Sequence, residues 1–342
     1  MTGRPLETLP KAHLHLHFTG SMRHATVIEL AAEQGLRLPD ALTDEWPPDL
    51  STADEKGWFR FQRLYDIARS ALRTEDGVRR LLREAAEDDA REGSRWLEIQ
   101  VDPSGYGAGF GGITAFTDLV LDAARQASES TGTIVQVVIA ANRTRHPLDA
   151  RTLARLAAQY AGRGVVGFGL SNDERRGEAL SFAKAFAIAD RAGLIATPHA
   201  GELCGPESVW SCLDGLGAQR IGHGVRSIED PQLVAHLADE GITCEICPTS
   251  NVSLGVYPDL GTVPLRKLYD AGVRIALGAD DPLLFGTRLL AQYEAAREHH
   301  GFSDADLAEL ARMSIRGSCA PTDVRTRLLA DVDTWLTAPP DG

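Results

Sequence analysis

Eight short stretches rich in apolar and β-branched residues recur along the chain, separated by longer stretches rich in alanine, leucine and arginine. Several of the short stretches are almost continuously apolar, as is typical of parallel strands covered on both faces. Most have a glycine before or just after them, where strands often end. We predict strands at 11–18, 94–102, 133–141, 165–171, 194–202, 220–225, 242–251 and 274–282.

The stretches between these strands place apolar residues at helical spacing. In residues 75–92, for example, Val78 and Leu81 share one face and charged residues occupy the other. Asp149 and Asp230 stand where helix N-caps are expected. Further helices are predicted at 116–130, 149–162, 178–192, 229–240 and 261–271, with a shorter and less regular one at 205–217.

Strands that alternate with helices predict βα units and a parallel sheet. Eight such units favour a closed (β/α)8 TIM barrel of the α/β class, and 342 residues exceed the roughly 250 that such a barrel needs. The chief insertion would be helical and lie at about 19–93, after the first strand, and residues 303–336 would add C-terminal helices. Since no linker-like segment interrupts the pattern, we expect residues 1–342 to form a single domain.

Composition and charge exclude several classes of function. The chain has 35 basic and 48 acidic residues, and a net charge of −13 argues against binding to nucleic acid or to an anionic membrane. No run of 18 apolar residues and no secretory signal is found, so a cytoplasmic location is expected. Five cysteines are too few and odd in number for a disulfide framework, and we expect Cys244 and Cys247 to pack in the core.

Ionisable residues gather at the predicted ends of four strands, where barrel enzymes place their active sites. They are His13, His15 and His17 on the first strand, His199 and Glu202 on the fifth, His223 on the sixth, and Asp280 and Asp281 on the eighth. Alternation along the first strand would turn its three histidines into the barrel, with His13 one layer deeper, where it would pack or support the site.

Imidazole nitrogen together with carboxylate oxygen is a donor set that suits zinc, and the missing cysteine ligands favour a catalytic site that keeps a water molecule. Zinc lowers the pKa of such a water to about 7. The cluster therefore predicts a metal-dependent hydrolase.

Five motifs stand in a fixed order between residues 10 and 282. They are Pro10-Lys11 through His15-Leu16-His17 and Gly20-Ser21, then His199-Ala200-Gly201-Glu202, Arg220-Ile221-Gly222-His223-Gly224, Cys247-Pro248-Thr249-Ser250-Asn251-Val252, and Asp280-Asp281-Pro282. With these motifs the chain resembles the adenosine deaminase family of the metal-dependent amidohydrolase superfamily. The resemblance implies one Zn²⁺ per subunit, held by His15, His17, His199 and Asp280.

The resemblance also implies catalytic roles for Glu202, His223 and Asp280. Glu202 would give a proton to the purine ring nitrogen beside the amine-bearing carbon, and His223 would orient the attacking water and help to take its proton. A carboxylic acid can act in this way only if burial raises its pKa. Substrate contacts are implied for His17, Thr19 and Asp281, the last with the imidazole-ring nitrogen of the purine.

The reaction that the resemblance implies is hydrolytic deamination of adenosine, and of 2′-deoxyadenosine, with release of ammonia. The partner would be a small purine nucleoside, and the oligomeric state is not predicted. Thr19 is uncharged, whereas the family commonly has an aspartate there that holds the ribose 5′-hydroxyl. A deaminase of another aminopurine, such as adenine or 6-aminodeoxyfutalosine, therefore stays open. For 6-aminodeoxyfutalosine, an adenine nucleoside with an aromatic carboxylate, Arg143 and Arg145 would receive that carboxylate.

Two further segments, a turn and a helix, are expected to lie near the site. Asn172 stands at a turn where the family commonly has glycine, and asparagine tolerates unusual backbone angles better than most residues. Residues 57–73 predict an extra helix whose Trp58, Phe61 and Tyr65 would cover the purine as a lid.

Overall fold

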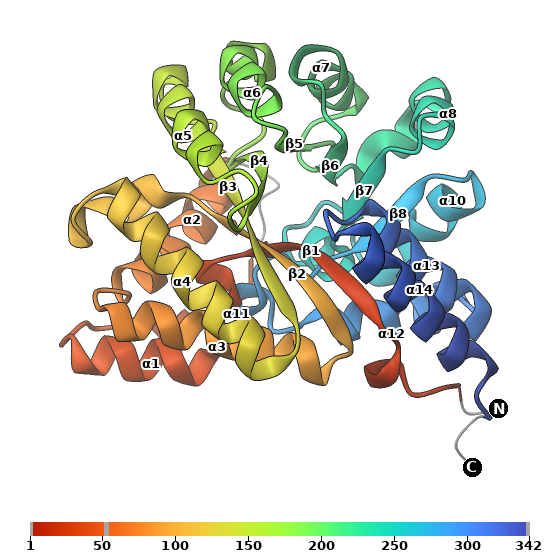
Figure 1. Ribbon diagram of the computed structural model, residues 1–342, viewed down its shortest axis with the longest axis horizontal. Coiled ribbons are helices and arrows are strands. Elements are labelled where there is room, and N and C mark those ends of the chain that lie inside the picture. The colour runs from red at the N-terminus through yellow and green to blue at the C-terminus, as the bar shows by residue number, and fades with distance from the viewer. Residues whose placement is uncertain (1–2, 51–54, 340–342) are drawn as a thin grey trace.

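The computed structural model describes residues 3–50 and 55–339, and its centre is a parallel barrel whose eight strands follow one another in chain order (Figure 1). The strands are β1 Lys11–His17, β2 Ser94–Val101, β3 Ile134–Asn142, β4 Val165–Ser171, β5 Ile195–Ala200, β6 Arg220–His223, β7 Thr243–Ile246 and β8 Arg274–Leu277. The prediction of a (β/α)8 barrel is confirmed. All eight predicted strands are present, although several are shorter than predicted.

The barrel closes where β1 meets the residues that follow β8. The His17 amide donates to the carbonyl of Asp280 at 2.9 Å, and the Asp280 amide donates to the carbonyl of His15 at 3.0 Å. Asp280 itself has a positive φ of 61°. This closure brings the two ends of the motif series, on the first and the last strand, into contact.

Helices surround the barrel (Figure 1). They are α1 His24–Glu33, α2 Glu55–Ser70, α3 Glu75–Arg91, α4 Ile113–Thr131, α5 Pro147–Gln159, α6 Ala183–Asp190, α7 Pro206–Leu216, α8 Pro231–Asp239, α9 Pro248–Ser253, α10 Leu265–Asp270, α11 Pro282–Phe285, α12 Leu289–His300, α13 Asp304–Gly317 and α14 Thr322–Thr337. As predicted, helices fill the segment between the first two strands, and two helices follow residue 303.

One of the two predicted N-caps is correct. The Asp230 side chain accepts from the amide of Gln232, with Pro231 at the first helical position of α8. The prediction for Asp149 is wrong, because α5 begins two residues earlier. There the ring of His146 accepts from the amide of Leu148 instead.

The seventh strand is shorter than the predicted 242–251. β7 ends at Ile246, and α9 starts at Pro248, whose fixed φ and missing N–H suit a first helical turn. The motif Cys247–Val252 thus forms a loop and a short helix at the mouth of the barrel. That is where its side chains can reach a site.

β1 also departs from the predicted alternation. Between His13 and Leu16 its register against β2 shifts, so that three steps on β1 match two on β2. Such a bulge reverses the side on which the earlier residues point. His13 therefore contacts Asp89 on α3, with its Nδ1 at 3.0 Å from Oδ1, and the prediction that it shares a face with His15 and His17 is wrong.

No helix in the described part of the chain combines the length and the apolar composition that crossing a membrane requires.

Candidate active site

The end of β1 places two imidazoles at the mouth of the barrel. His15 is fully buried and His17 is partly exposed, and their ring centroids lie 5.3 Å apart. His15 Nδ1 lies 2.8 Å from Oε2 of the buried Glu245 on β7. This contact fixes the orientation of the ring and leaves its Nε2, a buried atom without a hydrogen-bond partner among the described residues, facing the cluster.

His199 approaches from β5, and its ring centroid lies 4.7 Å from that of His15. The neighbouring strand makes room for it with a glycine. A Cβ on Gly222 would lie 2.7 Å from the His199 ring and 3.1 Å from that of His15. Gly222 is therefore required by the packing of the two histidines.

Asp280 completes the group from the end of β8. Its Oδ1 lies 3.1 Å from His17 Nε2 and 3.6 Å from His15 Nε2, and Ser250 on α9 donates to its Oδ2 at 2.6 Å. Although burial opposes ionisation, the contacts with His15 and His17 hold the pKa of Asp280 well below its usual value. The aspartate is thus a carboxylate.

These side chains have the composition and spacing of a metal site. Potential ligand atoms of His15, His17 and His199 lie within 4.8 Å of one another, and so do those of His15, His223, Cys247 and Asp280. The Cys247 thiol donates to the carbonyl of Glu245 at 3.6 Å, so it is engaged outside the cluster. The remaining nitrogen and oxygen donors suit a divalent cation such as zinc.

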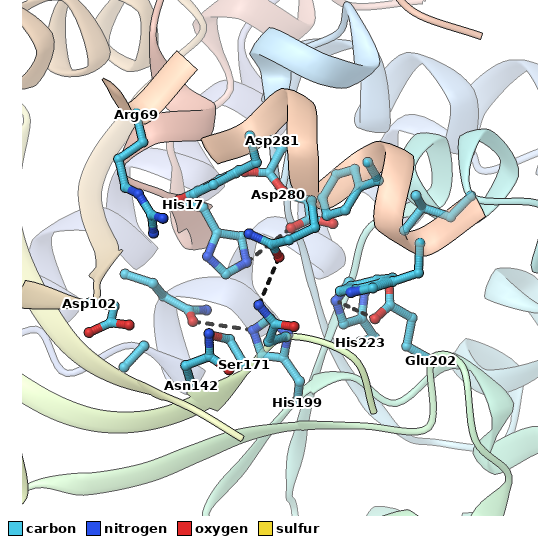
Figure 2. A pocket seen from close by; sticks show the side chains of 18 of the residues that line it. His17, Arg69, Asp102, Asn142, Ser171, His199, Glu202, His223, Asp280 and Asp281 are labelled. Atoms are coloured by element: carbon cyan, nitrogen blue, oxygen red, sulfur yellow. Dashed lines mark hydrogen bonds and ion pairs between the residues drawn. The ribbon is translucent and has the colours of Figure 1, made fainter. Parts of the chain in front are cut away.

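Glu202 and His223 lie beside this cluster, with His223 Nε2 at 3.6 Å from Glu202 Oε2 (Figure 2). Burial, reinforced by the charges of Asp280 and Glu174, raises the pKa of Glu202 well above its usual value. Burial and the neighbouring His15 lower the pKa of His223 to about 3. The site therefore pairs a carboxylic acid whose pKa is raised by burial with a neutral imidazole.

The loop that carries Glu202 is shaped by Glu174, which sequence reasoning missed. The Glu174 carboxylate accepts hydrogen bonds from four successive amides at 2.6–2.9 Å, those of Gly201, Glu202, Leu203 and Cys204. One buried acid thereby fixes the path of the chain directly after β5. An acid just beyond the fourth strand end, at the mouth of the barrel, was the signal available in the sequence.

Asp281 and Thr19 differ in their access to the cavity. Asp281 lines the cavity, its Oδ1 has no hydrogen-bond partner among the described residues, and burial raises its pKa to about 7. Thr19 is fully buried, does not line the cavity, and its hydroxyl bonds to the hydroxyl of Tyr106. Contact between Thr19 and a substrate remains a prediction.

The cavity beside the cluster has a volume of about 80 Å³. Trp58, Phe61 and Tyr65 on α2 form one of its walls, as the lid hypothesis requires. The expectation for Arg143 is wrong, because its buried guanidinium donates to the carbonyls of Glu174 and His199 and does not line the cavity. Arg145 does not line it either.

The barrel, the cluster of histidines and a carboxylate at its strand ends, and the buried acid Glu202 beside them define a hydrolase of the amidohydrolase class. A sequence model of the adenosine deaminase family matches residues 10–335, nearly the whole chain. The chain therefore belongs to the adenosine deaminase family, and it is an aminopurine hydrolase of that family.

Relatives and solved structures agree with this assignment. A Streptomyces virginiae protein described as an adenosine/adenine deaminase is 65% identical over 334 residues, which are 98% of each chain. The crystal structure of an adenine deaminase from Arthrobacter aurescens matches with a TM-score of 0.89 and 29% identity over 96% of this chain and 99% of that one. An amidohydrolase from Burkholderia ambifaria with bound zinc matches with a TM-score of 0.85 and 26% identity over 96% and 92%.

Proposed function

We propose that the protein converts adenosine and water into inosine and ammonia, with one Zn²⁺ per subunit. The observation that carries this proposal is the position of Glu202, a carboxylic acid with a raised pKa, beside a cluster of three histidines and an aspartate. Hydrolysis at an amine-bearing aromatic carbon needs both a hydroxide and a proton donor at the neighbouring ring nitrogen. The site offers groups for both.

His15, His17, His199 and Asp280 would hold the metal. The buried and unpartnered Nε2 of His15 supports this assignment, because an imidazole nitrogen without a partner is costly in a protein interior. When bound, the metal would supply hydroxide at neutral pH by lowering the pKa of water to about 7.

The other residues would act on the purine itself. Glu202 would donate its proton to N1 as the aromatic ring loses its conjugation, and His223, neutral at pH 7, would orient the attacking water and accept its proton. Asp281, whose pKa burial raises to about 7, would in its protonated form donate a hydrogen bond from the otherwise unpartnered Oδ1 to N7. Trp58 and Phe61 would cover the ring and exclude bulk water.

Adenine is the second candidate substrate. The Arthrobacter aurescens structure is that of an adenine deaminase, and Thr19 offers no charge to a ribose 5′-hydroxyl. Both candidates share the chemistry at C6, so they differ only in what the far end of the cavity binds.

A spectrophotometric assay tests the proposal. Conversion of adenosine into inosine, or of adenine into hypoxanthine, shifts the ultraviolet absorption, and metal analysis of the same sample gives the zinc content. Purified protein with one zinc per chain that deaminates neither compound would refute the proposal.

A further inference from the structure

Three polar side chains line the cavity on the side away from the proposed catalytic acid. Asp102 follows β2, Asn142 ends β3 and Ser171 ends β4, so they come from three neighbouring strands. Figure 2 shows Asp102 and Asn142 on the opposite side of the pocket from Glu202 and His223. We call Asp102, Asn142 and Ser171 the distal polar group.

The distal polar group has unused hydrogen-bonding atoms, and local contacts fix where they are. Asp102 uses only Oδ1, which accepts from the amide and hydroxyl of Ser104 at 2.9 and 2.6 Å. Asn142 likewise uses only Oδ1, which accepts from the amide and hydroxyl of Thr144 at 2.9 and 2.8 Å. Within the described chain, Asp102 Oδ2, Asn142 Nδ2 and the Ser171 hydroxyl therefore have no partner.

The three free groups differ in hydrogen-bonding character. Asp102 Oδ2 accepts, Asn142 Nδ2 donates, and a serine hydroxyl does either. The register places Asn142 directly opposite Ser171 on the adjacent strand. Such a mixed set matches a ligand whose groups both donate and accept, which is the property of sugar hydroxyls.

The charge around the distal polar group argues against an anionic ligand. Among the described residues that line this part of the cavity, the one cation is Arg69 on α2, which donates to Asp66 at 2.7 Å and is therefore already paired. Arg145 lies outside the lining, where it donates to the hydroxyl of Ser104 at 3.3 Å. Asp102 itself is an acid: burial raises its pKa, while its bonds to Ser104 and the charges of Arg145 and Arg69 favour the carboxylate. A phosphate or carboxylate would be repelled here, whereas neutral hydroxyls would not.

The geometry of a purine connects this end of the cavity to the reaction. C6, which carries the amine, and N9, which carries the sugar, lie on opposite edges of the ring system. With C6 beside the histidine cluster, a substituent on N9 points away from it. We propose that the distal polar group binds the ribose 2′- and 3′-hydroxyls, so that the preferred substrate is a ribonucleoside and neither a free base nor a nucleotide. This inference rests on the proposed deamination at C6.

The test is the specificity constant kcat/KM for adenosine, 2′-deoxyadenosine, 3′-deoxyadenosine, adenine and adenosine 5′-monophosphate. We expect adenosine to be preferred over every other compound. In Asp102→Asn, the ratio of kcat/KM for adenosine to that for adenine should fall roughly 10- to 100-fold, as expected for loss of a hydrogen bond to a charged group. In Ser104→Ala, which removes a partner of Oδ1 and leaves Oδ2 in place, the ratio should stay within about twofold.

Asn142→Asp gives a second test, because it keeps Oδ1 and replaces the free donor with an acceptor. It should lower the same ratio even if Asp102→Asn folds poorly. Wild-type protein that prefers adenine or the monophosphate, or variants that leave the ratio unchanged, would refute the sugar subsite and leave the proposed deamination standing. Protein that deaminates none of the five compounds would refute both.

Discussion

Asn172 Nδ2 donates a hydrogen bond to Gln62 Oε1 at 2.7 Å, and this bond joins α2 to the loop after β4. Both residues line the cavity. Asn172 holds a positive φ of 83°, a conformation that asparagine adopts more readily than most residues. The side chain at the turn thus fastens the helix that carries the aromatic wall.

Removing this bond should loosen α2. A neutral hydrogen bond contributes about 0.5–1.5 kcal/mol, so Asn172→Gly should raise KM for the purine roughly two- to tenfold, because glycine keeps the backbone conformation and loses the bond. Amide hydrogen exchange in α2 should become faster. Asn172→Ala is the matched control: it loses the same bond but adds strain at φ 83°, so it should also lower the melting temperature. Unchanged exchange and KM in Asn172→Gly would show that the bond does not hold the helix.

Much of the barrel and of its metal-site cluster could be predicted because one rule relates a residue's position in the sequence to its position in the fold. Side chains at the ends of parallel strands meet at one mouth, and this rule identified His15, His17, His199 and Asp280 as neighbours. The same rule, applied to the second and third strands, would also have pointed to Asp102 and Asn142.

The orientation of His13 and the role of Arg143 could not be predicted, because they depend on contacts between segments that are distant in the sequence. The bulge in β1 that turns His13 toward Asp89 is a shift of register between strands, and alternation alone predicts the opposite side. Arg143 follows a strand end as a substrate-binding arginine would, yet its guanidinium donates to two backbone carbonyls, that of Glu174 in the loop after β4 and that of His199 on β5.

Glu202→Gln tests the proposed proton donor. Glutamine keeps the shape and cannot give up a proton, so kcat should fall by roughly 10²–10⁴-fold, the usual contribution of a general acid. Zinc content should stay at the wild-type level, because Glu202 is not among the proposed ligands. Loss of zinc in this variant would mean that the residue belongs to the metal site instead.

Glu245→Gln tests whether the orientation of His15 matters for metal binding. Glu245 contacts His15 Nδ1 at 2.8 Å, and a carboxylate in this position makes the imidazole a stronger ligand. We expect zinc affinity, measured by competition with a chelator, to fall about 10- to 100-fold. Glu98→Gln is the control, because Glu98 and Glu245 both contact Arg220 and only Glu245 contacts His15. An equal loss in both variants would attribute the effect to the buried ion pairs.

Lys11 makes stability depend on pH through burial. It lies at the start of β1, its Nζ donates to the carbonyl of Leu6 at 2.8 Å, and burial lowers its pKa from 10.5 to about 7. Between pH 7 and 10.5 the unfolded chain therefore holds a proton at this position that the folded chain has released. The free energy of unfolding should rise with pH in this window, by at most about 1.4 kcal/mol per pH unit from this group.

Lys11→Met isolates that contribution, because methionine fills similar space and does not titrate. Denaturant unfolding at pH 7, 8 and 9, with a chelator present so that metal binding adds no pH dependence, should give a smaller rise with pH for the variant than for the wild type. Below pH 7 both the folded and the unfolded wild-type chain carry the charge, so the stability cost of burying it no longer changes with pH. There the free energies of unfolding of the two proteins should differ by a constant amount. Parallel curves between pH 7 and 9 would mean that Lys11 releases no proton on folding.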